Sequence, residues 1–312
     1  MRIQGVRMKL SSVDTLNVIY LAIVSGLVLA FHDRVTHWIR LPLLLVAYAL
    51  VIALMAWTGG RHPGSRPLRM LRLVYPLMAL PFVYGAIENY VLVVHGHFLD
   101  VRMNEWEHGL FGAYPNVYLE RFVSRPLNEF MMASYFSFYF YVIAPSLTLL
   151  AQERYADLER FVFTILVTFY ACYLGFVLLP LVGPVLSLKD TFALPELRGY
   201  VFAPLQSFIM AHGDPPGTCF PSSHVAVAWT GLLCMRQCFG KKVFWGILPL
   251  TVSLTVAVVY NRYHYVSDSL AGLATAGVCY ASCDWFLRRV RRPDKTAEGE
   301  SVRDEDRALT TA

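Results

Sequence analysis

Long apolar stretches are the feature that most constrains the fold of this chain. Eight of them are expected, at residues 15–31, 39–57, 72–94, 129–150, 161–185, 222–239, 243–260 and 266–287. A helix of about 20 apolar residues can cross the hydrocarbon core of a bilayer. Only 16% of the residues are charged, against about 25% in soluble proteins. The sequence therefore predicts an all-α, polytopic membrane helix bundle, with one integral membrane domain over residues 1–290.

The segments between these stretches differ in character. Residues 95–128 mix aromatic and charged side chains, which predicts helices lying at the headgroup level. Residues 186–221 are rich in Pro and Gly, and residues 291–312 are polar with mixed charge, which predicts a disordered cytoplasmic tail. Prolines within the apolar stretches predict helix kinks; these are Pro76, Pro81, Pro145 and Pro180.

The charge and the cysteines exclude several functions. The net charge of +5 comes from basic residues in the loops, so no nucleic-acid partner is expected. The six cysteines show no spacing typical of a metal site or a disulfide framework. His95, His97 and His108 are irregularly spaced in an aromatic loop, which favours interfacial residues over metal ligands. We therefore expect no metal and no cofactor.

Two short motifs carry the chemistry. The first, Pro221-Ser222-Ser223-His224, has the form of a helix start, where a Ser caps and free N–H groups can bind an anion. The second places Asp268 four residues after His264, so the carboxylate can orient the imidazole. An oriented His is a good nucleophile or base, and a second His can act as an acid. Each motif alone is also compatible with an ordinary helix start, and the pair is more specific than either.

The distribution of Lys and Arg predicts the orientation in the membrane. With both termini inside, the inner segments hold about twice as many basic residues as the outer ones, which is the bias expected of cytoplasmic loops. The N- and C-termini are then cytoplasmic. His224 and His264 both fall at the extracytoplasmic face, although a pair of spans separates them in the sequence.

The pair of motifs resembles the type 2 phosphatidic acid phosphatase superfamily, whose motifs are Pro-Ser-Gly-His and His-x-x-x-Asp. The closer resemblance is to its inositol phosphorylceramide synthase-like branch. It extends over Pro-Ser-Ser-His-Val-Ala at 221–226, His264 to Asp268 with Ala271-Gly272, Pro180 to Pro184, and Leu110 to Pro115. The resemblance covers about residues 70–287 and implies a six-helix phosphatase core preceded by two further helices.

The resemblance also implies a mechanism. His264 would attack phosphorus and form a phosphohistidine, Asp268 would hold its ring, and His224 would protonate the leaving oxygen. Ser222, Ser223 and nearby N–H groups would hold the phosphate, and no metal would be needed. The substrate would be a phosphorylated lipid or phospholipid at the outer leaflet.

The chain departs from the family at its basic residues. The superfamily has Lys-x₆-Arg-Pro before the second motif, and no such string occurs in the outer loop. An Arg six residues before the His is also missing, since Val258 stands there. Phosphate binding is therefore assigned to three substitutes: Lys189, Arg198 and Arg262.

Several functions remain open from the sequence. A lipid phosphatase is favoured slightly over inositol phosphorylceramide synthase-like transfer of a phospho-headgroup to a lipid alcohol. A transporter is the alternative of another class, since kinked helices suit it, but the chain has no repeated halves. A non-catalytic lipid-binding protein is the third, and the intact His, His and Asp speak against it. The sequence determines neither the lipid nor the oligomeric state.

Overall fold

The fold is a bundle of helices, as the apolar stretches predict. The computed structural model describes residues 10–35, 40–62, 64–213 and 215–290, and no strand occurs among them. The α-helices are α1 (Ser12–Ala30), α2 (Arg40–Arg61), α3 (Arg66–Ala86), α4 (Asp100–Phe111), α5 (Pro115–Tyr118), α6 (Arg125–Phe136), α7 (Phe138–Ala151), α8 (Tyr155–Leu178), α9 (Pro184–Ser187), α10 (Phe202–Gly213), α11 (Ser223–Phe239), α12 (Lys241–Tyr260) and α13 (Val266–Val290). Short 3₁₀ helices are η1 (His32–Arg34), η2 (Ile87–Asn89) and η3 (Leu119–Phe122). The predicted tail at 291–312 lies outside the described residues.

Within the part of the chain that the structure describes, six helices are long and apolar enough to cross a membrane: α1, α2, α3 extended by η2, α8, α12 and α13. The sequence predicts eight spans, and two of these are not single long helices in the structure. The predicted span at 129–150 is the pair α6 and α7, bent by 40° at Ser137. The predicted span at 222–239 is α11, which has 17 residues and rises about 26 Å, slightly less than a bilayer core.

The kink predicted at Pro180 is wrong. Helix α8 ends at Leu178, so Pro180 lies in the loop that follows instead of inside a span. A proline disfavours the helical conformation at the residue before it. Leu179 precedes Pro180 and is not helical, so the helix ends there and is not kinked. Pro76 and Pro81 do lie inside α3, and Pro145 lies inside α7.

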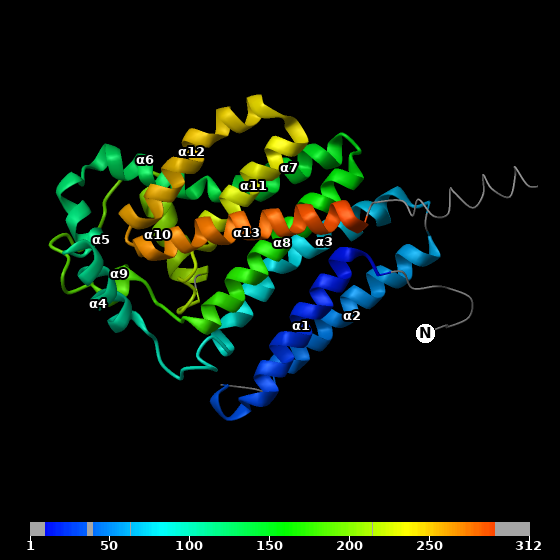
Figure 1. The fold of residues 1–312 in the computed structure, drawn as a ribbon, viewed down its shortest axis with the longest axis horizontal. Coiled ribbons are helices and arrows are strands. Elements are labelled where there is room, and N and C mark those ends of the chain that lie inside the picture. The colour runs from blue at the N-terminus through cyan, green and yellow to red at the C-terminus, as the bar shows by residue number, and fades with distance from the viewer. Residues whose placement is uncertain (1–9, 36–39, 63, 214, 291–312) are drawn as a thin grey trace, which may run out of the picture.

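Helix α8 forms the centre of the bundle (Figure 1). It packs against α1, α3, α7, α11 and α13. More than half of its residues are buried, including Phe161, Ile165 and Phe176. By contrast, α2 at the edge of the bundle exposes a row of aliphatic side chains, including Leu43, Leu50 and Leu54. Exposed apolar surface of this kind on a long helix is what a lipid-facing span requires.

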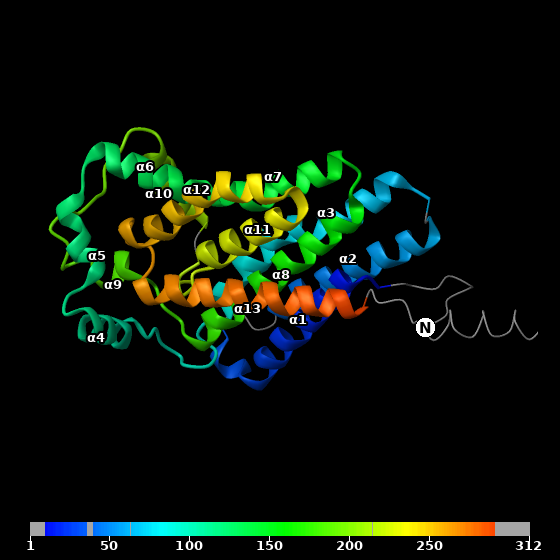
Figure 2. The same cartoon turned by 45° about the horizontal axis from the view of Figure 1, so that its top comes forward.

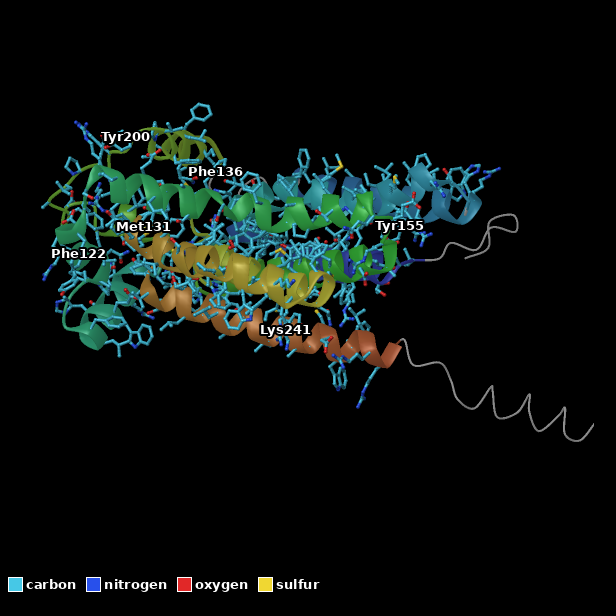
Figure 3. All side chains as sticks on the ribbon, turned by 90° about the horizontal axis from the view of Figure 1, so that it is seen from above. Phe122, Met131, Phe136, Tyr155, Tyr200 and Lys241 are labelled. Carbon is cyan, nitrogen blue, oxygen red and sulfur yellow. The ribbon has the colours of Figure 1, made fainter. Side chains whose placement is uncertain are left out.

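The connecting segments gather at one end of the bundle. Helices α4, α5, α9 and α10 lie there, together with the start of α13 and the end of α12 (Figures 1 and 2). Figure 3 shows Phe122 and Tyr200 at this end and Tyr155 toward the other. The starts of α11 and α13, which carry the two motifs, therefore meet these connecting segments at a single end.

Candidate active site

The two motifs predicted to act together lie side by side. The centroids of the His224 and His264 rings are 5.8 Å apart. Two backbone contacts join the segments: the Ser222 N–H donates to the Asp268 carbonyl oxygen at 3.0 Å, and Gly272 lies against the Ser222 carbonyl. A Cβ at Gly272 would come within 2.7 Å of that oxygen. The Ala271-Gly272 pair is thus explained by the close approach of α13 to α11.

The pair of His264 and Asp268 has the relationship that the spacing predicts. Nδ1 of His264 lies 3.4 Å from Oδ2 of Asp268, and both side chains are buried. The same oxygen accepts the N–H of Tyr265 at 2.9 Å. The carbonyl of His264 accepts a hydrogen bond from the Asn116 amide at 3.0 Å, and that amide also donates to Val259. The His264 segment is therefore held on both its side chain and its backbone.

Cys219 is a member of this cluster that the sequence did not predict. Its Sγ donates to Oδ2 of Asp268 at 2.8 Å and lies 3.4 Å from Nδ1 of His264. In the sequence, Cys219 is only one of six cysteines without the spacing of a metal site or a disulfide framework. It lies 45 residues before His264, so no local spacing could reveal the contact.

His224 lies at the start of α11 with its ring against two aromatic side chains. The ring centroids of Tyr135 and Phe138 are 4.5 and 4.3 Å away. Within the described residues, Nδ1 of His224 has no hydrogen-bond partner. This aromatic packing fixes the plane of the ring.

Both histidines line one recess of about 300 Å³. Its other lining residues come from α3, α6, the 181–186 segment, α10, the 215–219 segment and the loop between α12 and α13. They are Tyr84, Tyr135, Leu181, Val182, Val185, Leu186, Met210, Pro215, Pro216, Gly217, Thr218, Cys219 and Tyr263. In the described part of the chain, no Lys or Arg lines this recess. It is a site with two imidazoles, a thiol and little fixed positive charge.

An apolar cleft of about 290 Å³ adjoins the recess. The two share Tyr84, Tyr135, Met210 and His224. The cleft continues between α3, α7, α8 and α10, where its lining includes Leu77, Pro81, Tyr139, Val142, Ile143 and Phe169. The His224 ring therefore stands between a polar recess and an apolar cleft among the spans.

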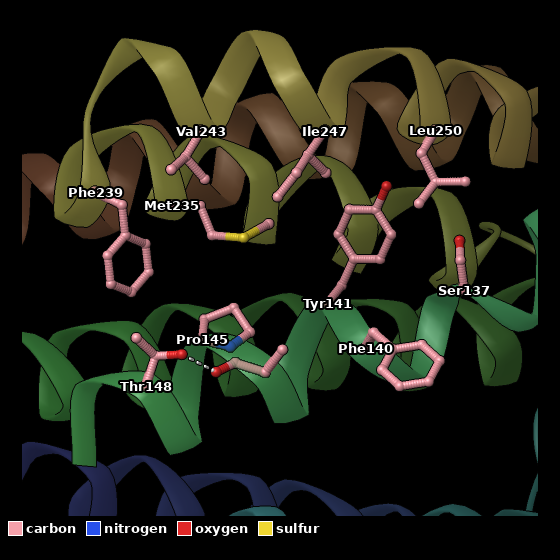
Figure 4. Close-up of a pocket in the computed structure, with 11 residues that line it drawn as sticks. Ser137, Phe140, Tyr141, Pro145, Thr148, Met235, Phe239, Val243, Ile247 and Leu250 are labelled. Carbon is pink, nitrogen blue, oxygen red and sulfur yellow. Dashed lines mark hydrogen bonds between the residues drawn. The ribbon is translucent and has the colours of Figure 1, made fainter. Parts of the chain in front are cut away.

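A separate groove contains neither histidine. It is lined by α7, α11 and α12, with Tyr141, Met235, Phe239 and Ile247 among its side chains (Figure 4). Its one drawn hydrogen bond is local, from the Thr148 hydroxyl to the Ala144 carbonyl. With no titratable group other than Tyr141 in its lining, this groove lacks the means for phosphate chemistry.

The three basic substitutes lie outside the recess. Arg262 is buried and donates to Glu120 at 2.6 Å and to the Leu194 carbonyl at 2.7 Å. Burial lowers the pKa of its guanidinium, and Glu120 opposes that effect. Arg198 is exposed beside Glu196, and Lys189 is exposed after α9. Arg198 and Arg262, with Arg125, line a second recess of about 600 Å³ that shares Val185 and Tyr263 with the first.

The two motif serines have different surroundings. Ser222 is the N-cap of α11, and its fully buried hydroxyl accepts the Val225 N–H at 3.4 Å. Ser223 lines the apolar cleft beside His224. The first serine thus shapes the helix start, and the second borders the space that a ligand can enter.

Two carboxylates of α4 support the site and were missed from the sequence. Glu107 accepts both the N–H and the hydroxyl of Ser267 at 2.7 Å, at the start of α13. Asp100 accepts the N–H groups of Val182 and Gly183 and the hydroxyl of Tyr265. Burial raises the pKa of both carboxyls, although these hydrogen bonds oppose the shift. Their spacing of seven residues on one helix was the available signal.

Gly183 allows the 180–184 segment to pack closely against the loop that carries His264. Its φ of +89° is a conformation that side chains rarely adopt, and a Cβ there would meet the Tyr263 carbonyl at 2.7 Å. The 180–184 segment can lie against the His264 loop because this position is Gly.

A paired imidazole and carboxylate and a second imidazole, on one recess of a helix bundle with membrane-spanning character, are the groups that nucleophilic or acid–base chemistry uses. The family model of the PAP2 superfamily, the type 2 phosphatidic acid phosphatases, matches residues 103–282. This covers more than half of the chain, so the protein belongs to that superfamily. Neither a curated protein nor a solved structure matches the chain. Membership supports a phosphatase- or phosphotransferase-type lipid enzyme; it does not distinguish the inositol phosphorylceramide synthase-like branch.

Proposed function

We propose that this protein is a lipid phosphatase or phosphotransferase that acts through a phosphohistidine. The observation that carries the proposal is the pair of rings, His224 and His264, 5.8 Å apart on one recess that adjoins an apolar cleft. A phosphoryl group between two imidazoles can be attacked by one and released with a proton from the other.

In the proposed reaction Nε2 of His264 attacks phosphorus, and the bond from phosphorus to the leaving oxygen breaks. Asp268 accepts the Nδ1–H and stabilises the imidazolium as charge develops, which its 3.4 Å distance from that nitrogen supports. His224 donates a proton to the leaving oxygen. Water or an alcohol then attacks the phosphohistidine, and His224 takes the proton of that nucleophile. No metal takes part in these steps.

The phosphate oxygens need donors, and the recess offers few cations. We assign Ser222, Ser223 and the first free N–H groups of α11 to this role, because a helix start favours an anion. Arg262, Arg198 and Lys189 are assigned as the long-range positive charge. Arg262 and Arg198 line the adjoining recess, which supports an effect through space more than direct contact.

The apolar cleft supports a lipid as the substrate. A phosphorylated headgroup in the recess would have its chains directed past Tyr84 and His224 into the cleft, toward Leu77 and Phe169. The cleft lies among long apolar helices, so a lipid can enter from the bilayer without crossing water.

The side of the membrane follows from charge. Both termini are assigned to the cytoplasm because the basic residues concentrate in the segments on their side. The recess lies at the end of the bundle where α4, α5, α9 and α10 gather (Figure 2). We therefore assign the site to the extracytoplasmic face and its substrate to the outer leaflet.

Transfer of a phospho-headgroup to a lipid alcohol, as in the inositol phosphorylceramide synthase-like branch, is the second candidate. One observation favours it: the recess of about 600 Å³ beside the first, lined by Arg125, Arg198 and Arg262. A hydrolase needs only water beside the phosphohistidine, whereas a transferase needs a pocket for an acceptor.

The test offers purified protein a panel of lipid phosphates and phospholipids, with and without acceptor alcohols. Release of free phosphate identifies a hydrolase, and a new phospholipid identifies a transferase. His264→Ala and His224→Ala are each expected to abolish the reaction while the protein remains folded. Full activity in either variant, or lipid flux without any chemical change, contradicts the proposal.

A further inference from the structure

Three metal-binding atoms converge beside the recess. Sγ of Cys219, Nδ1 of His264 and Oδ2 of Asp268 lie within 4.8 Å of one another, and all three residues are buried. We propose that Cys219, His264 and Asp268 form an inhibitory site for Zn²⁺. Thiolate, imidazole and carboxylate are the donors that Zn²⁺ binds in proteins.

The donor atoms are already close to the geometry of such a site. The three edges of the triangle measure 2.8 Å for Sγ–Oδ2 and 3.4 Å for each contact of Nδ1. Tetrahedral bonds of about 2.0–2.3 Å need edges of roughly 3.3–3.6 Å. Only the Sγ–Oδ2 edge has to lengthen, by less than about 1 Å.

The ion has a route to the site and a fourth ligand. Cys219 and His264 line the recess, so a cation that enters the recess meets their side chains directly. Water in the recess supplies the fourth ligand. The second carboxylate oxygen, Oδ1 of Asp268, is buried with no hydrogen-bond partner among the described residues, so it is not committed to another donor there.

Binding opposes catalysis through the tautomer of His264, and this step rests on the proposed function. The Cys219 thiol loses its proton to solvent, and Nδ1 of His264 gives its lone pair to the metal. The remaining ring proton then stays on Nε2, the nitrogen that must attack phosphorus. The ion also removes Asp268 from its role. The protein is active only when the site is empty.

The first experiment measures binding directly, without any turnover. Purified full-length protein in detergent is titrated with Cd²⁺, whose bond to a thiolate gives an ultraviolet charge-transfer band, and Zn²⁺ is then added as competitor. We expect a band at one Cd²⁺ per chain that Zn²⁺ removes. Cys219→Ser should lose it, and His264→Ala should weaken Cd²⁺ binding at least tenfold.

The matched control is Cys238→Ser, at the far end of α11 from His224. It should keep the band. A band that survives in Cys219→Ser, or disappears in Cys238→Ser, overturns the assignment. A protein that turns over no lipid but shows this pattern would refute the proposed function and leave the metal site standing.

The second experiment measures inhibition. Each variant is assayed with Zn²⁺ and expressed as a fraction of its own activity in EDTA, which cancels any effect of the substitution on the reaction. We expect EDTA to reverse inhibition of the natural protein, and the half-inhibiting Zn²⁺ concentration to rise at least tenfold in Cys219→Ser. The same half-inhibiting concentration in Cys219→Ser and the natural protein would contradict an inhibitory role for the site.

Discussion

The backbone N–H of Ser222 donates to the carbonyl oxygen of Asp268 at 3.0 Å. One hydrogen bond thus joins the N-cap of α11, two residues before His224, to the residue whose carboxylate lies 3.4 Å from Nδ1 of His264. His224 lies in α11 and His264 lies in the loop just before α13, so α12 separates them in the chain. The Ser222–Asp268 contact and the close packing of Gly272 set their relative position. Small changes at the contact should therefore affect the reaction more than their size suggests.

Gly272 gives the sharpest test of this packing. Gly272→Ala places a methyl group 2.7 Å from the Ser222 carbonyl, so α13 must shift away from α11. We expect activity to fall at least tenfold and the unfolding temperature to drop, because overpacking costs about 1–3 kcal/mol. The control is Gly277→Ala on the same helix, which meets nothing within 4 Å and should leave both quantities unchanged or slightly raised.

Asn116 tests the backbone support of His264. Asn116→Asp keeps the shape but removes the amide donor to the carbonyls of Val259 and His264. It also places a carboxylate against two carbonyl oxygens. We expect kcat to fall tenfold or more as the His264 ring loses its position, with a smaller change in KM. Steady-state kinetics on a lipid phosphate measure both, and an unchanged kcat would show that this support is dispensable.

Asp268→Asn tests the proposed role of Asp268 in orienting His264. The amide keeps one oxygen that can accept from Tyr265 and Cys219, but it lacks the negative charge that Oδ2 places 3.4 Å from Nδ1 of His264. In other enzymes, replacing the Asp that orients a catalytic histidine by Asn lowers kcat strongly. We therefore expect a loss of about two to four orders of magnitude in kcat. Circular dichroism should show an unchanged helix content. Activity within threefold of the natural protein would remove Asp268 from the mechanism.

Glu107 predicts a pH dependence of stability. Burial raises the pKa of its carboxyl above the ordinary value of 4.5, so the folded state binds its proton more tightly than the unfolded state. Its contribution to stability is therefore complete below that ordinary value and is lost as pH rises through the raised pKa. As pH rises from the ordinary carboxyl pKa of 4.5 through the raised pKa of Glu107, we expect the unfolding temperature of the natural protein to fall relative to that of Glu107→Gln. A constant difference between the two proteins would contradict the prediction.

The sequence predicted the class of fold because apolar length is a local property. It predicted the His264–Asp268 contact from a spacing of one helical turn, although His264 lies in the loop before α13 and only Asp268 lies in the helix. It missed Cys219, Asp100 and Glu107, since these reach the site from segments far away in the chain. It also erred where a local rule had two outcomes. Pro180 ends α8 instead of kinking it, and Ser137, which no breaker residue marks, is where α6 and α7 bend.

The most direct test of the central claim is to trap the phosphorylated protein. Purified protein is mixed with a lipid carrying labelled phosphate, quenched in base within the first turnover, and digested for mass spectrometry. Base preserves phosphohistidine, whereas phosphoserine is lost. The account predicts label on His264 and none in His264→Ala. It also predicts that the label leaves His264, to water or to an added acceptor alcohol, when the quench is delayed. Label on His224 or elsewhere, or rapid turnover with no labelled protein, would contradict it.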